Sequence, residues 1–239
     1  MTGRISEIWV YLSTTPLLGL TVTLVAYQAA YWLYAKLDLN PLANPVAVSV
    51  ALLVALLWFT GTPYDVYFDG AKFVHFLLGP ATVALAVPLY ANLDKLRTNL
   101  IPLAGALFAG SLAAVVSAVG VAAALGASRE TLLSLAPKSV TTPIAMGIAE
   151  KLGGLPSLTA VLVVTTGILG AVLARGLLNL LRIEDHAVRG FAVGVAAHGI
   201  GTARAFQVSE PMGAFAGLAM GLNGLVTAFL FPVLVRVFG

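Results

Sequence analysis

The sequence predicts an all-α, polytopic helical membrane protein of transporter-like architecture, with inverted repeats and broken helices that re-enter or cross. Of the 239 residues, 59% are hydrophobic and only 10% are charged, whereas soluble domains carry about 25% charged residues. The mean hydropathy is +0.98, and several apolar runs reach the roughly 20 residues that cross a bilayer. Polar segments rich in proline or glycine interrupt other apolar runs, which favours broken helices over continuous ones.

We expect a single integral membrane domain over residues 1–239 in a multi-pass arrangement. The first run begins at Pro16, where a missing amide costs little. Residues 61–72 carry Asp65 and Asp69 among aromatic side chains, which predicts an interfacial loop. The predicted spans and half-helices are residues 16–36, 45–60, 73–93, 100–125, 143–152 (half-helix), 155–181, 190–198 (half-helix) and 211–238.

Composition and motifs argue against an enzyme and against a nucleic-acid partner. The chain has no cysteine, which excludes disulfides and thiolate chemistry. The formal charge of +3 reports mainly on loop orientation in a membrane protein. Neither a His-Glu-x-x-His metal motif nor a phosphate-binding loop is present, and the glycines at 199 and 201 follow an apolar helix rather than a strand. We therefore expect no catalytic residue, cofactor or metal.

The most distinctive stretch runs from Pro137 to Pro143, between long apolar runs. Its prolines prevent an uninterrupted helix, because proline lacks an amide donor and clashes with the preceding turn. Between them stand one ammonium and three hydroxyls, on Lys138, Ser139, Thr141 and Thr142. Non-helical backbone at membrane depth is tolerated where it is buried or lines a cavity, so these residues are candidate contacts for a small anion. Alternatively, the lysine extends to the interface and the hydroxyls bond their own backbone.

A second polar interruption follows residues 190–198 and supplies the remaining candidates, which are His198, Gly199, Gly201, Thr202 and Arg204. An arginine fork suits a carboxylate, and a histidine that titrates near neutrality suits coupling to a proton. The coupling ion of such a carrier would be either H⁺ or Na⁺. The alternative is a glycine-broken loop with a solvated arginine and a satisfied histidine. Asn223 in the last span is either a further substrate contact or a hydrogen bond between helices.

A possible internal repeat supports the broken-helix fold. A shift of 57 positions places Pro80 on Pro137, and each proline begins an interrupted segment that a full span follows. Paired interrupted segments are typical of transporter sites. If the segment at Pro137 dips in and returns, the later arginines join the earlier basic loops on one side, as the positive-inside rule favours. We therefore expect an inverted relation between the spans that start at Leu100 and Leu155.

Four segments carry a resemblance to a known family: LLGPATVALAVPLY (Leu77 to Tyr90), PKSVTTPIAM (Pro137 to Met146), AAHGIGTARA (Ala196 to Ala205) and GLAMGLNG (Gly217 to Gly224). They resemble the LrgB/CidB family of bacterial membrane proteins, to which half of the plastid glycolate/glycerate translocator also belongs. The resemblance covers the chain from about the third apolar run to the end.

The resemblance implies two alternative functions in the inner (plasma) membrane. One is a carrier that moves small monocarboxylates such as pyruvate, glycolate or glycerate by alternating access past the two broken segments. The other is an antiholin-like regulator of murein hydrolase export and lysis, acting with a small LrgA/CidA-like membrane partner. It also implies kinship with transporters built from inverted repeats. We expect the lipid bilayer and further copies of this chain as additional partners.

Overall fold

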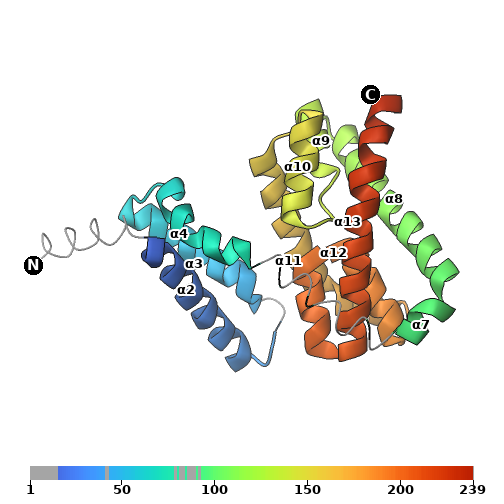
Figure 1. Cartoon of the computed structure of the whole chain (residues 1–239), viewed down its shortest axis with the longest axis horizontal. Helices are drawn as coiled ribbons and strands as arrows, with labels where there is room; N and C mark the ends of the chain where they lie inside the picture. Colours follow the sequence, from blue (N-terminus) through green and yellow to red (C-terminus); the bar gives the residue numbers. More distant parts are fainter. Residues whose placement is uncertain are drawn as a thin grey trace, which may run out of the picture. The chain divides into compact units, whose positions relative to one another are not determined.

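The computed structural model describes residues 16–40, 43–77, 80, 84, 90 and 93–238. Every regular element among these residues is a helix, which confirms the predicted all-α fold. Within this part of the chain, four helices are long and apolar enough to cross a membrane: Leu17–Lys36, Leu100–Ala124, Pro156–Leu180 and Glu210–Phe229. The chain forms two compact units, Met1–Ala84 and Leu85–Gly239, each of which is taken by itself below (Figure 1).

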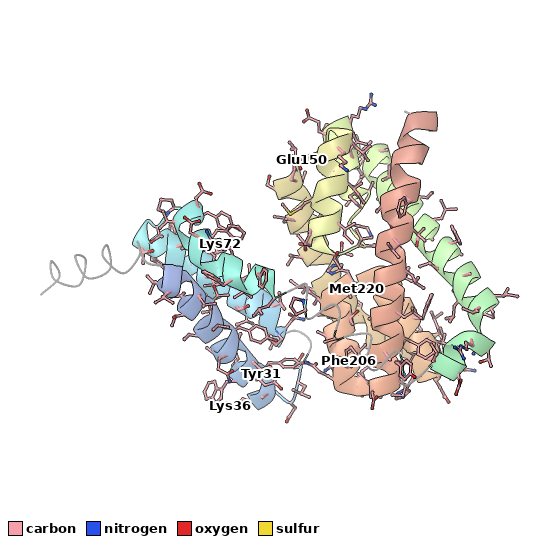
Figure 2. The ribbon with its side chains drawn as sticks, in the orientation of Figure 1. Tyr31, Lys36, Lys72, Glu150, Phe206 and Met220 are labelled. Carbon is pink, nitrogen blue, oxygen red and sulfur yellow. The ribbon has the colours of Figure 1, made fainter. Side chains whose placement is uncertain are left out.

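The first unit contains α2 (Pro16–Lys36), α3 (Pro45–Thr60) and α4 (Tyr64–Phe76). Both α3 and α4 pack on α2. Asn44 caps α3 by accepting hydrogen bonds from two backbone amides of its first turn, and Gly61 ends the helix in the left-handed conformation that glycine adopts without strain. Near the end of α2, the Lys36 ammonium lies 3.9 Å from the ring centre of Trp32 (Figure 2).

The predicted interfacial loop over residues 61–72 is wrong, because α4 occupies most of it. Gly19 of α2 lets this helix approach closely: a Cβ there would lie 3.0 Å from the Cα of Gly70. The Thr23 hydroxyl also pairs with the Tyr67 hydroxyl at 2.8 Å. These contacts join residues that are 51 and 44 positions apart, so the local sequence did not indicate the helix. Most of the predicted 73–93 span beyond α4, with the neighbourhood of Pro80, lies outside the described residues.

The second unit contains α7 (Leu93–Thr98) and three long helices, α8 (Leu100–Ala124), α11 (Pro156–Leu180) and α13 (Glu210–Phe238). These agree with the predicted apolar runs to within a residue or two at each end. Between α8 and α11 lie α9 (Arg129–Leu135) and α10 (Thr142–Leu152), and between α11 and α13 lies α12 (His186–Val208). Figure 1 shows α9 and α10 at one end of this unit and α7 at the other.

The segment from α9 to α10 is a hairpin, and its tip is the stretch 136–141 that the prolines interrupt. Residues 136–141 are not helical, and α10 begins at Thr142 with Pro143 in its first turn. After α10 the chain returns beside α9, because the amide of Leu155 donates to the Ser134 hydroxyl at 2.7 Å. The Thr159 hydroxyl then donates to the Ser134 carbonyl at 3.0 Å. The start of α11 thus lies beside the last turn of α9.

The segment α12 is a second hairpin, whose tip is at Ala197 and His198. Both residues have non-helical backbone angles, and His198 has φ 36° and ψ −143°. The two ends of α12 meet again, since His186 Nδ1 shares a hydrogen bond with the hydroxyl of Ser209. Because α12 follows the end of α11, this α12 hairpin enters from the end of the unit opposite to that of the α9–α10 hairpin.

The predicted half-helix 190–198 and the predicted break over 199–204 both need correction. Helix α12 already begins at His186, where the Asp185 side chain caps it, and residues 199–208 are helical. Gly201 serves close packing instead of flexibility: a Cβ there would lie 2.7 Å from the Cβ of Ala197 and 2.9 Å from a methyl of Val193. The glycine therefore lets the second arm of the hairpin fold back over the first.

Candidate functional site

The tips of the two hairpins come together on α13, and Asn223 is the residue that joins them. Its side chain is 1% exposed. Its Nδ2 donates to the carbonyl of Ser139 in the first tip and to the carbonyl of Val195 just before the second, both at 3.1 Å. Its Oδ1 accepts from the hydroxyl of Ser111 on α8. One amide thus connects α8, α13 and both hairpins.

His198 lies in the second tip and faces α11. Its side chain is 4% exposed, and its Nε2 lies 2.8 Å from the carbonyl oxygen of Val163. Gly167 makes room for the ring, because a Cβ there would lie 2.6 Å from its Cε1. Val163 also packs with Val140 of the first tip. The predicted proline and histidine clusters are therefore neighbours in space.

The first tip and the start of α10 carry the other polar candidates, Lys138, Thr141 and Thr142. Lys138 is half-buried and its Nζ donates to the Ser139 hydroxyl at 3.1 Å. No carboxylate among the described residues forms a salt bridge with it. Thr141 and Thr142 are half-buried at the start of α10. Their side chains lie where the amides of the first turn have no helical partner.

Thr202 completes the buried polar group on the second arm of α12. Its hydroxyl donates to the His198 carbonyl at 2.9 Å and lies 3.8 Å from the sulfur of Met220 on α13 (Figure 2). Gly199 is exposed, while Gly201 is buried between the arms. Of the ten candidate residues, eight therefore lie at one of the two tips or within four residues of it, and a ninth, Asn223, joins the tips.

Arg204 is the exception. It lies farther along the second arm of α12 and lines a separate cavity of about 340 Å³ together with Arg175 and Arg189. Its Nη1 donates to the Gln207 side chain at 3.0 Å. Neither Lys138 nor His198 lines that cavity. A substrate contact of Arg204 at the tips stays a prediction.

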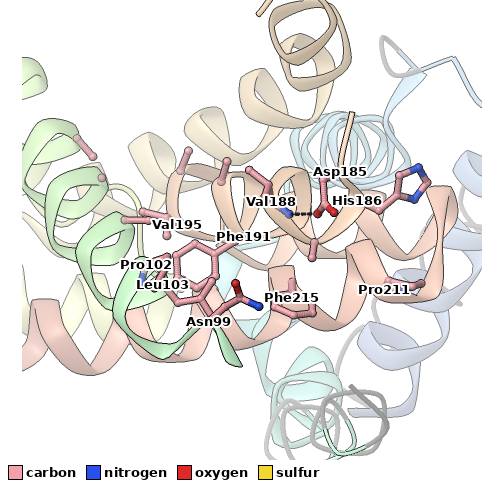
Figure 3. A pocket seen from close by; sticks show the side chains of 16 residues that line it. Asn99, Pro102, Leu103, Asp185, His186, Val188, Phe191, Val195, Pro211 and Phe215 are labelled. Atoms are coloured by element: carbon pink, nitrogen blue, oxygen red, sulfur yellow. Dashed lines mark hydrogen bonds between the residues drawn. The ribbon is translucent and has the colours of Figure 1, made fainter. Parts of the chain in front are cut away.

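The tips themselves leave little free space. The cavity between Asn223, Ser139 and Ser111 has a volume of about 10 Å³, room for no more than about one water molecule. A much larger cavity of about 760 Å³ lies between α8 and the first arm of α12, but none of the ten candidates lines it. Its walls are mostly apolar, and its few polar groups include Asn99 and Asp185 (Figure 3).

Several residues that shape this junction were not predicted. Val163 contributes a backbone carbonyl, which no side-chain pattern reveals, and Ser111 is one hydroxyl in a long apolar span. Gly190 and Gly194 on α12 bring it against α13: a Cβ on Gly194 would overlap the carbonyl oxygen of Ala216. The glycine-rich composition of α12 was a signal for such close packing, but it did not identify the facing helix.

Comparisons with known proteins all indicate the same family. The profile of the LrgB-like family matches residues 23–237. The Bacillus subtilis protein YxaC is 36% identical over 91% of this chain and 94% of its own length. The holin-like protein CidB of Staphylococcus aureus is 30% identical over 93% of this chain and 96% of its own length. The antiholin-like protein LrgB of Bacillus mycoides is 31% identical over 94% of this chain and 98% of its own length. No solved structure matches the chain.

Proposed function

Because the chain belongs to the LrgB-like family, we propose that it is a holin-like or antiholin-like protein of the plasma membrane that modulates cell lysis. Its partner in this role is a small membrane protein of the LrgA/CidA kind, and the affected process is the export of murein hydrolases. The observation that carries the proposal is the match to CidB and LrgB along 93–94% of the chain, which includes both hairpins and α13.

This role predicts a change in lysis that depends on the partner. The test expresses the full chain in a bacterial strain without its own LrgB-type gene, with and without the small partner. We expect the rate of lysis and the murein hydrolase activity in the medium to change only when both proteins are present. The small partner alone and an empty vector are the controls. The proposal is contradicted if cells lyse equally with and without the chain although both proteins are shown to be present in the membrane.

A second candidate function is favoured by the two hairpins, which enter from opposite ends and meet at Asn223. This arrangement supports a carrier for small monocarboxylates such as pyruvate, glycolate or glycerate, since transporter sites lie where broken helices from two repeats converge. Arg129 and His186, the first residues of α9 and α12, are 57 positions apart, the spacing of the predicted repeat. The inverted repeat itself stays a prediction.

The chemistry of the tips suits a carboxylate. Helix α10 and the second arm of α12 both begin at the tips, and the start of a helix attracts anions through its free amides and its dipole. Lys138 adds a positive charge, and Thr141, Thr142 and Ser139 add hydroxyl donors. His198 is the group that would couple uptake to a proton. Since the space at Asn223 holds about one water, substrate entry requires the tips to separate, as alternating access does.

The carrier role predicts uptake of labelled pyruvate or glycolate by liposomes that contain the purified chain. Lys138→Ala should lower uptake at least about tenfold, because a hydrogen bond to a charged group contributes about 1.5–3 kcal/mol. The matched control is Lys151→Ala, an exposed lysine at the end of α10, which should leave uptake unchanged. Uptake by Lys138→Ala at the wild-type rate would refute the assignment of Lys138 to the substrate site. If the wild-type chain takes up no substrate, with or without the small partner, the carrier role is refuted and the lysis role is the one that remains.

A further inference from the structure

A second polar site lies at the end of the unit opposite to the α9–α10 hairpin. It is the cavity of about 340 Å³ between the last turns of α11 and both arms of the α12 hairpin. Three guanidinium groups line it, one on α11 and two on α12: Arg175, Arg189 and Arg204. The remaining wall consists of Asn179, small apolar side chains and Met212. Among the described residues that line this cavity, none is acidic.

Arg189 has a donor that the protein leaves without a partner. Its Nη2 donates to the Asn179 side chain at 2.7 Å, which fixes the direction of the guanidinium. Its Nε is buried, and it is the one buried side-chain nitrogen or oxygen in the described part of the chain that has no hydrogen-bond partner. Leaving a buried donor of a charged group unpaired is costly. The guanidinium of Arg189 lines the cavity, where its other N–H groups can donate to a bound acceptor.

The charge of the cavity selects an anion. Three guanidinium groups around one space attract a negative group to it. The planar arginine fork matches phosphate oxygens in pairs of parallel hydrogen bonds. A volume of about 340 Å³ exceeds what a small monocarboxylate needs, and the apolar part of the wall suits a ligand with carbon atoms next to its charged group.

The position of the cavity adds a second reason for a phosphate. It lies where α11 ends and where both ends of α12 meet the start of α13, so it is at the level where helices leave the apolar span. The α11–α12 connection at the same end carries Arg182 together with Glu184 and Asp185. Positive residues concentrate on the cytoplasmic side, and basic pockets between membrane helices on that side bind phosphate head groups of anionic lipids.

We propose that the Arg175–Arg189–Arg204 cavity is a phosphate-binding site, whose ligand is either the head group of an anionic phospholipid or a free phosphate. This site uses none of the residues at the hairpin tips and goes beyond both proposed functions. Arg189 contacts the phosphate through amino hydrogens of its guanidinium group. Arg175 and Arg204 close over it from α11 and from the second arm of α12.

The test measures binding to the purified full chain in detergent with two probes. Native mass spectrometry counts retained phosphatidylglycerol against phosphatidylcholine, and equilibrium dialysis measures inorganic phosphate. Arg189→Gln should weaken binding of phosphatidylglycerol, of phosphate or of both at least about tenfold. Arg175→Gln should also weaken it, and because Arg175 is exposed this variant avoids the packing that Arg189 makes with Asn179. Arg182→Gln, at the same end but outside the cavity, should bind like the wild type.

The two probes separate the sources of the phosphate. Retention of phosphatidylglycerol with no binding of inorganic phosphate assigns the site to a lipid head group, and the reverse assigns it to a free phosphate. Binding that all three variants weaken equally would mean general attraction by a basic surface and would overturn the site. Binding that neither Arg175→Gln nor Arg189→Gln changes, or no binding of either probe by the wild type, would overturn it as well.

Discussion

Replacing Gly194 by alanine should lower the free energy of unfolding by about 2–3 kcal/mol, the usual cost of forcing extra carbon into a packed interior. Gly194 is buried in the first arm of α12, against the backbone of α13. An added Cβ would overlap the carbonyl oxygen of Ala216 and lie 2.8 Å from its carbonyl carbon. A backbone carbonyl within a helix has no alternative rotamer, so α12 and α13 have to move apart.

Gly120 in α8 provides the matched control for this substitution. It is also a helical glycine, but a Cβ there meets nothing within 4 Å. Gly120→Ala should therefore be neutral or stabilise the protein by up to about 1 kcal/mol, because alanine has the higher helix propensity. Denaturant unfolding in mixed micelles measures both variants. The close contact between α12 and α13 is refuted if the two substitutions change the unfolding free energy alike.

The long helices were predictable because their cause is local. Each of α2, α8, α11 and α13 follows from an apolar run of sufficient length, and the non-helical tip at residues 136–141 follows from the missing amide and the steric clash of proline. Helix α4 was missed because its stability depends on contacts with α2, in particular at Gly19. A sequence of aromatic and acidic residues is equally compatible with an interfacial loop.

The sequence indicated the polar residues at the junction of the hairpins but only part of their arrangement, and their role in binding stays a prediction. A lysine or an asparagine in an apolar membrane segment costs free energy, and this cost marks Lys138 and Asn223 as candidates from sequence alone. The direction in which α12 turns back depends on contacts of Gly201 and His198 with distant residues. That direction separates Arg204 from His198, although they are only six positions apart, and brings Arg204 beside Arg175 on another helix.

Asn223→Ala should have an effect as large as that of Gly194→Ala. It removes three hydrogen bonds and leaves the Ser111 hydroxyl and the carbonyls of Ser139 and Val195 without that partner. Unsatisfied buried groups cost about 1–3 kcal/mol each in soluble proteins, while hydrogen bonds between membrane helices average about 0.6 kcal/mol. For three bonds we expect a loss of about 2–4 kcal/mol.

The joining of both hairpin tips to α13 is tested most directly by the free energy of unfolding of Asn223→Ala in mixed micelles. The control is Ser117→Ala on α8, whose exposed hydroxyl bonds only the Ala113 carbonyl of its own helix and which should stay within about 0.5 kcal/mol of the wild type. A loss of about 2–4 kcal/mol in Asn223→Ala is the predicted result. Unfolding of Asn223→Ala at the same free energy as Ser117→Ala would contradict a junction held by this side chain.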